Sequence, residues 1–406
     1  MKALVYTQKE VMQYVKEEDV KFIRLAFCDP FGCQKNISIM PDELERAFSD
    51  GIGIDASAIS GFGGEIYSDL LLFPDPATLA VLPWRPNHGG VIRMFCSVRY
   101  PDGRPFELDS RRILRETVKA AAKEGYSFFF GAELEFYLFK TDEEGNPTGE
   151  PYDNAHYMDI APMDKGENIR REICLTLEQM GIRPESSHHE EGPGQNEIDF
   201  RFSDPVTAAD NAVTFLSVVK TIAMRNGLSV DFSPKPIADQ PGNSFHINVS
   251  VQNMRGGGDL FPQAIAGIMN RICDMTVFFN PTGQSYVRLG KDKAPQYVTW
   301  SPENRSQLIR IPAANGVYKR LELRSPDPTA NPYLAYALLI RAILEGIAEN
   351  EQPQPPSHVN LYALSQEELK HYQSLPKSLS EAKRLAKNSD FIRRVLPDAM
   401  IQNYCK

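Results

Sequence analysis

Four short segments of the chain carry charged or polar side chains at every second position. Side chains at positions i and i+2 of a strand lie on the same face, so each segment predicts a strand with one chemically active face. The segments are residues 131–136 (GAELEF), 197–202 (EIDFRF), 246–250 (HINVS) and 320–324 (RLELR). If the four faces converge, they form a cavity lined by Glu133, Glu135, Glu197, His246 and Glu322.

Such a cavity indicates metal-assisted chemistry. Unpaired buried carboxylates are costly, so the cluster requires cations. Many carboxylates with a single imidazole suit Mg²⁺ or Mn²⁺ better than zinc, which favours cysteine and more histidine. Phosphate or carboxylate recognition suits the guanidiniums of Arg305, Arg310, Arg320 and Arg324. Metal, arginine and carboxylates together indicate phosphoryl transfer.

Plainer interpretations stay open at this point. Any one of the four segments is also typical of a half-exposed strand in an antiparallel sheet, and the arginines could form surface ion pairs. The sequence holds no Walker-type phosphate loop and no Gly-x-Gly-x-x-Gly after a strand. His188 and His189 adjoin two glutamates, but no serine or cysteine elbow accompanies them.

Composition places the chain among ordinary globular proteins. It has 406 residues, of which 42% are hydrophobic and 24% charged, and its formal net charge is −9. A nucleic-acid partner is not expected, because such binding needs a basic face. No apolar run reaches the ~18 residues that span a bilayer, and the N-terminus lacks a long apolar signal core, so we expect no membrane association. Six scattered cysteines favour reduced thiols and a cytoplasmic location.

Local patterns predict an α+β fold with two domains. A turn at residues 100–103 (YPDG) marks the expected boundary between domains 1–100 and 101–406. Hydrophobic periodicity predicts the elements on both sides of it. In the first domain we expect helices over 10–16 and 41–48 and strands over 21–27, 35–40, 78–83 and 91–98. In the second we expect helices over 111–123, 167–180, 206–225, 257–279 and 332–350, strands over 197–202, 246–251 and 320–324, and a long strand or strand pair over 127–140.

At its chemical segments the chain resembles the glutamine synthetase family along nearly its whole length. Residues 131–139 (GAELEFYLF) look like that family's Glu-x-Glu strand, and residues 188–197 (HHEEGPGQNE) are similar to its His-His-Glu segment. Residues 304–312 (NRSQLIRIP) look like its phosphate-binding stretch, and residues 324–334 (RSPDPTANPYL) are close to its signature. The loop at residues 55–62 (DASAISGF) and the segment at 360–362 (NLY) also have counterparts in the family.

The resemblance implies a fold, co-substrates and an assembly. The expected fold is an N-terminal β-grasp domain followed by a catalytic domain with a curved antiparallel sheet. The expected co-substrate is ATP, with two or three Mg²⁺ or Mn²⁺ per site, and the expected substrates are glutamate and ammonia or an amine. Family members assemble into rings in which a loop of the neighbouring subunit completes the site, so we expect a homo-oligomer with the subunit number of a dodecamer.

The resemblance also implies roles for individual residues. One metal would be held by Glu135, Glu190 and Glu197, and the other by Glu133, His246 and Glu322. ATP would be bound by Ser250, Arg305, Arg310 and Arg320, with the arginines on the transferred phosphoryl group. The amino-acid substrate would contact Gly242, His246, Arg288 and Arg324, and the catalytic residues would be Asp55, Arg305 and Arg324.

Two pockets depart from the family pattern. The family's mobile flap carries a glutamate that helps to deprotonate ammonium, but the corresponding segment here, residues 290–295 (GKDKAP), has Lys293 in that place. A positive charge there repels ammonium, unless the register slips and Asp292 takes the role. Pro241 replaces an asparagine that contacts glutamate in the family. The sequence therefore does not identify the carboxylic acid that serves as substrate. Tyr362 matches a position that is adenylylated in some relatives.

Three functions follow from these residues. The first is a glutamine synthetase that forms glutamine through a γ-glutamyl phosphate, which the retained Asp55 supports. The second is a γ-glutamyl-amine ligase that uses an amine larger than ammonia, which Lys293 supports. The third is a non-catalytic structural or regulatory ring protein, against which stands the presence of six metal ligands.

Overall fold

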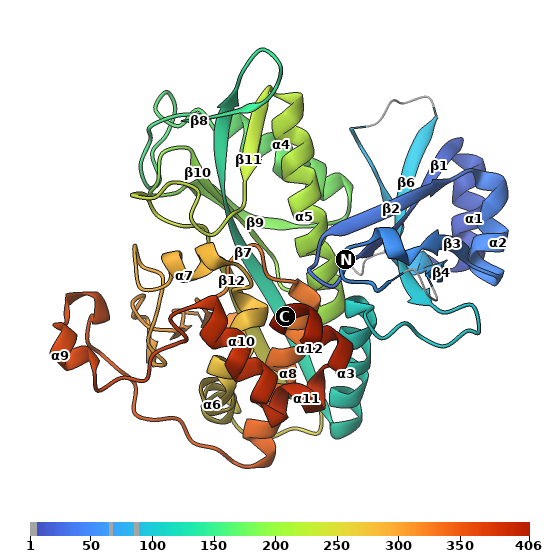
Figure 1. Ribbon diagram of the computed structural model, residues 1–406. Coiled ribbons are helices and arrows are strands. Elements are labelled where there is room, and N and C mark those ends of the chain that lie inside the picture. Colours follow the sequence, from blue (N-terminus) through green and yellow to red (C-terminus); the bar gives the residue numbers. More distant parts are fainter. Residues whose placement is uncertain (1–5, 65–67, 85–88, 315) are drawn as a thin grey trace.

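Two β-sheets dominate the computed structural model, which describes residues 6–64, 68–84, 89–314 and 316–406 (Figure 1). A six-stranded sheet occupies the N-terminal part of the chain, and a nine-stranded sheet belongs to the remainder. Helices and strands are mixed in both parts. The expected α+β class is therefore confirmed.

The N-terminal sheet has the strand order β2-β1-β6-β4-β3, and the short β5 pairs with β6. Strands β1 and β6 run parallel, while the other pairs are antiparallel. Helices α1 and α2 pack beside this sheet (Figure 1). The elements are α1 (Gln8–Glu17), β1 (Val20–Cys28), β2 (Gln34–Ile39), α2 (Leu44–Ser49), β3 (Ile52–Asp55), β4 (Asp69–Pro74), β5 (Ala80–Val81) and β6 (Gly90–Arg99).

The strand predicted over residues 78–83 is wrong for all but two of them. The preceding residues Pro76–Thr78 form a 3₁₀ turn, which proline favours because its φ is already suited to a first helical turn. The hydroxyl of Thr78 donates to the Asp75 carbonyl and accepts from the backbone N–H of Phe95. Local hydrogen bonding therefore replaces the ladder that an alternating pattern predicts.

The larger sheet has the order β13-β14-β15-β12-β7-β10-β9, with β8 and β11 also pairing with β7. The expected antiparallel sheet is correct except for β13 and β14, which run parallel, so the sheet is mixed. Residues 127–140 lie in one long strand, not in a strand pair. The strands are β7 (Tyr126–Thr141), β8 (Pro147–Pro151), β9 (Pro184–His189), β10 (Gln195–Phe200), β11 (Leu228–Asp231), β12 (Phe245–Asn253), β13 (Trp300–Pro302), β14 (Ile309–Ile311) and β15 (Leu321–Leu323).

Helices pack against this sheet and bury its apolar face. The long helix α8 is almost wholly buried, and it crosses α6 where two glycines meet. A Cβ on Gly267 would come within 2.3 Å of the Ala342 carbonyl oxygen, so only glycine fits there. The helices are α3 (Ser110–Glu124), α4 (Glu167–Gln179), α5 (Pro205–Arg225), α6 (Phe261–Phe279), α7 (Gly283–Arg288), α8 (Pro332–Ala348), α9 (Gln366–Leu369), α10 (Leu379–Asn388), α11 (Asp390–Val395) and α12 (Asp398–Cys405).

Buried polar contacts join the N-terminal part to the rest of the chain. The Arg111 guanidinium bonds Asp75, next to β4, and Asp210 on α5. The Tyr333 hydroxyl on α8 donates to the same Asp210 carboxylate. Near the C-terminus, Tyr404 donates to the Pro30 carbonyl in the turn after β1. The two sheets are thus fixed to each other by partnered charges and hydroxyls.

Among the residues that the structure describes, no helix is both long enough and apolar enough to cross a membrane.

Candidate active site

The register of three adjacent strands gathers the acidic side chains. Strand β7 lies between β10 and β12, and its Glu133 is opposite His246 on one side and Asp199 on the other. Glu135, two residues further, is opposite Glu197. Because alternate residues of a strand share a face, all these side chains project from the same side of the sheet. The predicted convergence of the strand faces is confirmed.

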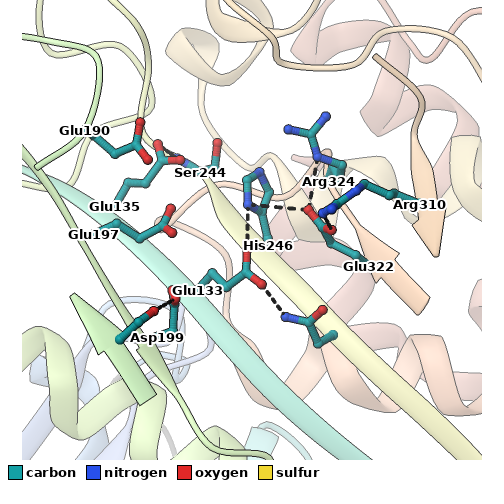
Figure 2. Close-up of polar contacts among 12 residues, drawn as sticks. Glu133, Glu135, Glu190, Glu197, Asp199, Ser244, His246, Arg310, Glu322 and Arg324 are labelled. Atoms are coloured by element: carbon teal, nitrogen blue, oxygen red, sulfur yellow. Dashed lines mark hydrogen bonds and ion pairs between the residues drawn. The ribbon is translucent and has the colours of Figure 1, made fainter. Parts of the chain in front are cut away.

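A first group joins β7, β12 and β15 (Figure 2). The Glu133 Oε2 atom is 3.2 Å from the His246 Nδ1 atom, which in turn is 3.9 Å from Glu322 Oε1. Asn248 donates to the other oxygen of Glu133 at 2.8 Å. Burial disfavours the charged form of Glu133, but the bonds from His246 and Asn248 outweigh it and lower its pKa to about 2. The contacts of Glu133 therefore favour its ionised form.

Two guanidiniums contact Glu322. One belongs to Arg324, as the sequence alternation predicts, but the other belongs to Arg310 instead of Arg320. Arg324 donates to Glu322 Oε1 at 3.1 Å, and Arg310 on the neighbouring strand β14 donates to Oε2. The alternation within residues 320–324 placed Arg320 beside this carboxylate, but its Nε atom bonds Asn248 instead. Arg320 lies just before β15, which begins at Leu321, so its side chain turns toward β12.

A second group lies beside the first and consists mainly of carboxylates (Figure 2). Glu190 follows β9 and bonds the His188 ring at 2.9 Å, while Glu197 lies 3.8 Å from the same ring. Burial and then the charge of Glu190 raise the pKa of Glu135, which accepts a hydrogen bond from the Ser244 backbone N–H. Burial and the neighbouring carboxylates raise the pKa of Glu197 well above its ordinary range. These like charges repel one another without a cation between them.

The donor atoms suit divalent metals. Among the residues that the structure describes, four overlapping sets of three place ligand-type atoms within 4.8 Å of one another, and carboxylate oxygens outnumber imidazole nitrogens in each. Oxygen-rich sets of this kind fit Mg²⁺ or Mn²⁺. The sets are Glu133–His246–Glu322, Glu135–Glu197–His246, His188–Glu190–Glu197 and Glu133–Glu197–Asp199.

Arg288 and Gly242 form a wall close to this cluster. Arg288 is 1% exposed; it donates to the Ser325 carbonyl and to the Ser244 hydroxyl. Gly242 passes so close that a Cβ would lie 2.9 Å from the Arg288 side chain and 2.3 Å from a backbone oxygen. Among the described residues, Arg288 Nε and Arg324 Nη1 are buried without a hydrogen-bond partner. Both guanidiniums can therefore donate further hydrogen bonds to oxygen atoms of a ligand.

A cavity of about 830 Å³, counted with its open mouth, lies on the other side of Glu133. Ser250 lines it from β12, and Arg320 and Asn248 line it near the carboxylate cluster. Its far wall is aromatic, since the rings of Phe202 and Tyr318 contact each other edge to face. This arrangement provides polar donors at one end and flat apolar surfaces at the other.

Two predicted residues do not join the cluster. Asp55 lies at the end of β3, the edge strand of the N-terminal sheet, and its exposed carboxylate accepts from the Ser57 backbone and hydroxyl. Arg305 lies in an exposed turn between β13 and β14. Within the described parts of the chain, neither residue makes a hydrogen bond or ion pair with the cluster.

Sequence reasoning missed several residues that the structure adds. Asp199 belongs to one of the metal-type sets, and its i+2 spacing from Glu197 was the available signal. Burial and the charge of Glu133 raise the pKa of Asp199 to about 6. Residues 289–296, which we call the flap segment, also contact the site region through ion pairs. Asp292 pairs with Lys235, and Lys293 pairs with Glu191. No short-range pattern predicts these pairs.

Comparisons with known proteins agree with this geometry. The glutamine synthetase β-grasp domain model matches residues 19–101, and the glutamine synthetase catalytic domain model matches residues 107–406. A glutamine synthetase of Methanosarcina mazei is 44% identical, and the match covers 98% of this chain and 92% of that protein. One from Clostridium saccharobutylicum is 43% identical, covering 98% and 93%, and one from Staphylococcus aureus is 39% identical, covering 96% and 91%.

Solved structures are similar over the same length. A structure titled a GmaS/ADP complex superposes with a TM-score of 0.87 at 27% identity, covering 97% of this chain and 93% of that one. The Plasmodium falciparum glutamine synthetase has a TM-score of 0.86 at 23% identity, covering 100% and 96%, and it supports the fold alone. The expected β-grasp and catalytic folds are confirmed. The chain belongs to the glutamine synthetase family of ATP-dependent ligases.

Proposed function

We propose that the chain is a glutamine synthetase, which uses ATP to join ammonia to the side-chain carboxylate of glutamate. The observation that carries this proposal is the largely buried Glu133–His246–Glu322 group, a metal-type set that lies directly beside two guanidiniums. Such a combination suits the transfer of a phosphoryl group. Relatives that are 39–44% identical over nearly the whole chain bear the name glutamine synthetase.

Six residues hold two divalent cations in this proposal. One cation is bound by Glu135, Glu190 and Glu197, and the other by Glu133, His246 and Glu322. The raised pKa values of Glu135 and Glu197 support this assignment, because a cation would offset the burial and the repulsion that raise them. When bound, Mg²⁺ or Mn²⁺ neutralises the charge of the phosphoryl group that is transferred.

The amino-acid substrate binds along the wall made by Gly242, Arg288 and Arg324, with His246 at its inner end. Unpartnered nitrogens on Arg288 and Arg324 support this role, since a carboxylate would satisfy them. Buried charges without partners are costly, so these two guanidiniums favour an anionic ligand.

ATP binds in the cavity that Ser250 and the Phe202–Tyr318 pair line. An aromatic wall suits stacking with a flat base, and the Arg320 end suits phosphate oxygens. Arg310 and Arg320 contact the phosphates, and the exposed Arg305 folds toward them from its turn.

The reaction proceeds in two steps, phosphorylation of the carboxylate and attack by the amine. A carboxylate is a poor electrophile, so the glutamate side-chain oxygen first attacks the terminal phosphorus of ATP and ADP leaves. The uncharged amine nitrogen then attacks the activated carbonyl carbon and inorganic phosphate leaves. The proton that the nitrogen loses passes to the departing phosphate, which gives the amide. Arg305 and Arg324 stabilise the negative charge that develops in these steps.

Assembly into rings completes the site in this proposal. Asp55 is exposed in the isolated subunit and lies on the edge strand β3. A neighbouring subunit would bring its own copy of this carboxylate to the acceptor side of the site. Light scattering at several protein concentrations measures the subunit number, for which we expect twelve.

A ligase for a larger amine is the second candidate. A cavity of about 940 Å³, counted with open space, adjoins Lys293 and is lined by Tyr297, Tyr362 and Leu364. It gives room for a carbon chain that ammonia lacks. Lys293 also places a positive charge where the family has a carboxylate.

Phosphate release from ATP with Mg²⁺ and glutamate tests both candidates. Ammonium is compared with a panel of primary amines at equal ionic strength, and the amide product is identified by mass spectrometry. Release with ammonium supports the glutamine synthetase, whereas release only with larger amines supports the second candidate. If no acceptor gives release with glutamate, the proposed function is wrong.

A further inference from the structure

Two ion pairs hold the flap segment, which contributes the acidic residue to one pair and the basic residue to the other. Asp292 and Lys293 are consecutive, and both have positive φ, 46° and 68°, which is unusual for residues other than glycine. The first pairs with Lys235 and the second with Glu191. Strained non-glycine backbone of this kind persists where surrounding contacts determine it, and it clusters at ligand-binding segments.

The carboxylate of Asp292 is already occupied. Its partner Lys235 has a side chain that is 3% exposed, and the same ammonium donates to the Gln240 carbonyl. Lys235 therefore anchors the base of the flap segment through a buried charge. Asp292 is the only acidic residue within residues 289–296. The flap segment consequently offers no free carboxylate to a cationic substrate.

Glu191 offers a carboxylate that contacts the flap segment. It follows Glu190 directly, and its backbone N–H donates to the Glu190 carboxylate at 3.0 Å. Its side chain is 35% exposed, and its carboxylate contacts the primary ammonium of Lys293, whose side chain is 57% exposed. Glu191, the residue after Glu190 in the chain, thus binds the alkylammonium group of Lys293.

We propose that Glu191 binds the ammonium group of the acceptor substrate, and that Lys293 is a tethered competitor for the same carboxylate. This inference rests on the proposed function, because it names how that reaction's acceptor is held. The ammonium of Lys293 has the same charge and the same N–H donors as ammonium or a protonated primary amine. A carboxylate that accepts one of them accepts the others.

Competition follows from the tether. Because Lys293 is attached to the same chain, its effective concentration at Glu191 is high, and an acceptor must displace it. The pair is exposed, so its net stabilisation is small and displacement is feasible. Lys293 therefore sets how much acceptor is needed, while Lys235 and Asp292 keep the base of the flap segment in place.

Kinetics with matched variants test the assignment. Glu191→Gln removes the charge at constant size, and Lys293→Met keeps the carbon chain but removes the ammonium. Lys291→Met is the control, because Lys291 is an exposed lysine in the same segment and makes no ion pair among the described residues. Phosphate release is measured against ammonium and ethylammonium, with Mg²⁺, ATP and glutamate each varied in turn.

We expect Glu191→Gln to raise the acceptor KM severalfold, up to about fivefold, which corresponds to the roughly 1 kcal/mol or less that an exposed ion pair contributes. Lys293→Met lowers the acceptor KM, and this gain disappears when Glu191 is also changed. The KM values for Mg²⁺, ATP and glutamate stay unchanged in both variants. An unchanged acceptor KM in Glu191→Gln overturns the proposal, and so does a parallel rise in the KM for Mg²⁺, which would mean that Glu190 is disturbed.

Chemical labelling gives a readout that needs no catalysis. Acetic anhydride modifies lysines that are not engaged in ion pairs, and mass spectrometry separates Lys293 from Lys291. Because ammonia itself consumes acetic anhydride, labelling of Lys293 is expressed relative to Lys291 in the same sample. Ammonium chloride should raise this relative labelling saturably, compared with sodium chloride at equal ionic strength, and Glu191→Gln should abolish the difference. Equal labelling in both salts overturns the proposal even if no reaction is found, so its failure is distinct from failure of the proposed function.

Discussion

The carboxylate cluster and the flap segment meet in the same region but are held by different forces. The cluster residues are mostly buried, and backbone ladders on both sides of β7 fix their spacing. The flap segment has no ladder of its own. Two side-chain ion pairs, a backbone turn between Gly290 and Ala294, and two non-glycine residues with positive φ define it. Exposed ion pairs are weak, whereas buried strand pairing is cooperative.

This difference separates two tasks of the site. Groups that bind metal and phosphate need positions that do not vary, and strand register provides them. The group that selects the acceptor can change without disturbing the sheet. Lys293 and Glu191 lie at positions that can vary in this way, since neither residue belongs to a strand of the cluster.

Removing a cluster carboxylate should have the largest effect, and it tests whether the fixed cluster is required for the reaction. Glu322→Gln keeps the size of a side chain that is 1% exposed but removes its charge. We expect phosphate release to fall at least about a hundredfold, because Glu322 is both a metal-type ligand and the partner of two guanidiniums. The exposed Glu116→Gln on α3 is the control. Full activity in Glu322→Gln would refute the metal assignment.

A second test uses the raised pKa of Asp199. Its ordinary value of 3.8 rises to about 6 in the folded protein, so the folded state binds this proton more tightly than the unfolded state. Asp199 therefore disfavours folding as pH rises from about 4 to above 6, by up to about 3 kcal/mol without metal. Asp199→Asn should raise the melting temperature of metal-free protein at pH 7, and less so near pH 4.

Added Mg²⁺ provides the control for this prediction. A cation at the cluster stabilises the ionised form of Asp199, so the advantage of the asparagine variant should shrink or reverse at saturating Mg²⁺. A melting difference between variant and wild type that does not depend on pH would show that the charge of Asp199 does not oppose folding.

A third test concerns the base of the flap segment. Lys235→Met preserves the buried carbon chain but leaves the Gln240 carbonyl and Asp292 without their donor. We expect a loss of about 2 kcal/mol in the free energy of unfolding, measured by urea denaturation. The exposed Lys119→Met serves as the matched lysine control. Equal stability of the two variants would mean that the flap segment is not anchored by this pair.

The smallest expected effect is that of Lys293→Met, and it tests whether the exposed ion pair of the flap segment is weaker than the pair made by the buried Lys235. Lys293→Met should change the free energy of unfolding by less than about 1 kcal/mol, because the Lys293–Glu191 pair is exposed. The same urea experiment measures it beside Lys235→Met. A loss as large as that of Lys235→Met would show that the tip of the flap segment is as firmly held as its base.

Local sequence pattern predicted the strand faces but not their partners. The i+2 spacing of Glu133 and Glu135 is a property of any strand, so their common face followed from sequence alone. Arg320 shows the limit of this reasoning, because the strand begins after it and its side chain turns to Asn248. Glu190 lies outside every strand, and only the resemblance to the family indicated it.

The sequence by itself determined the residue types, the alternation within each strand and the family. Tertiary structure decided which residues touch. Sequence spacing sets the face of a side chain within its own element, but a contact between residues 57 or 102 positions apart depends on how the whole chain folds. The Lys235–Asp292 and Lys293–Glu191 pairs are such contacts, and no periodicity within either segment encodes its distant partner.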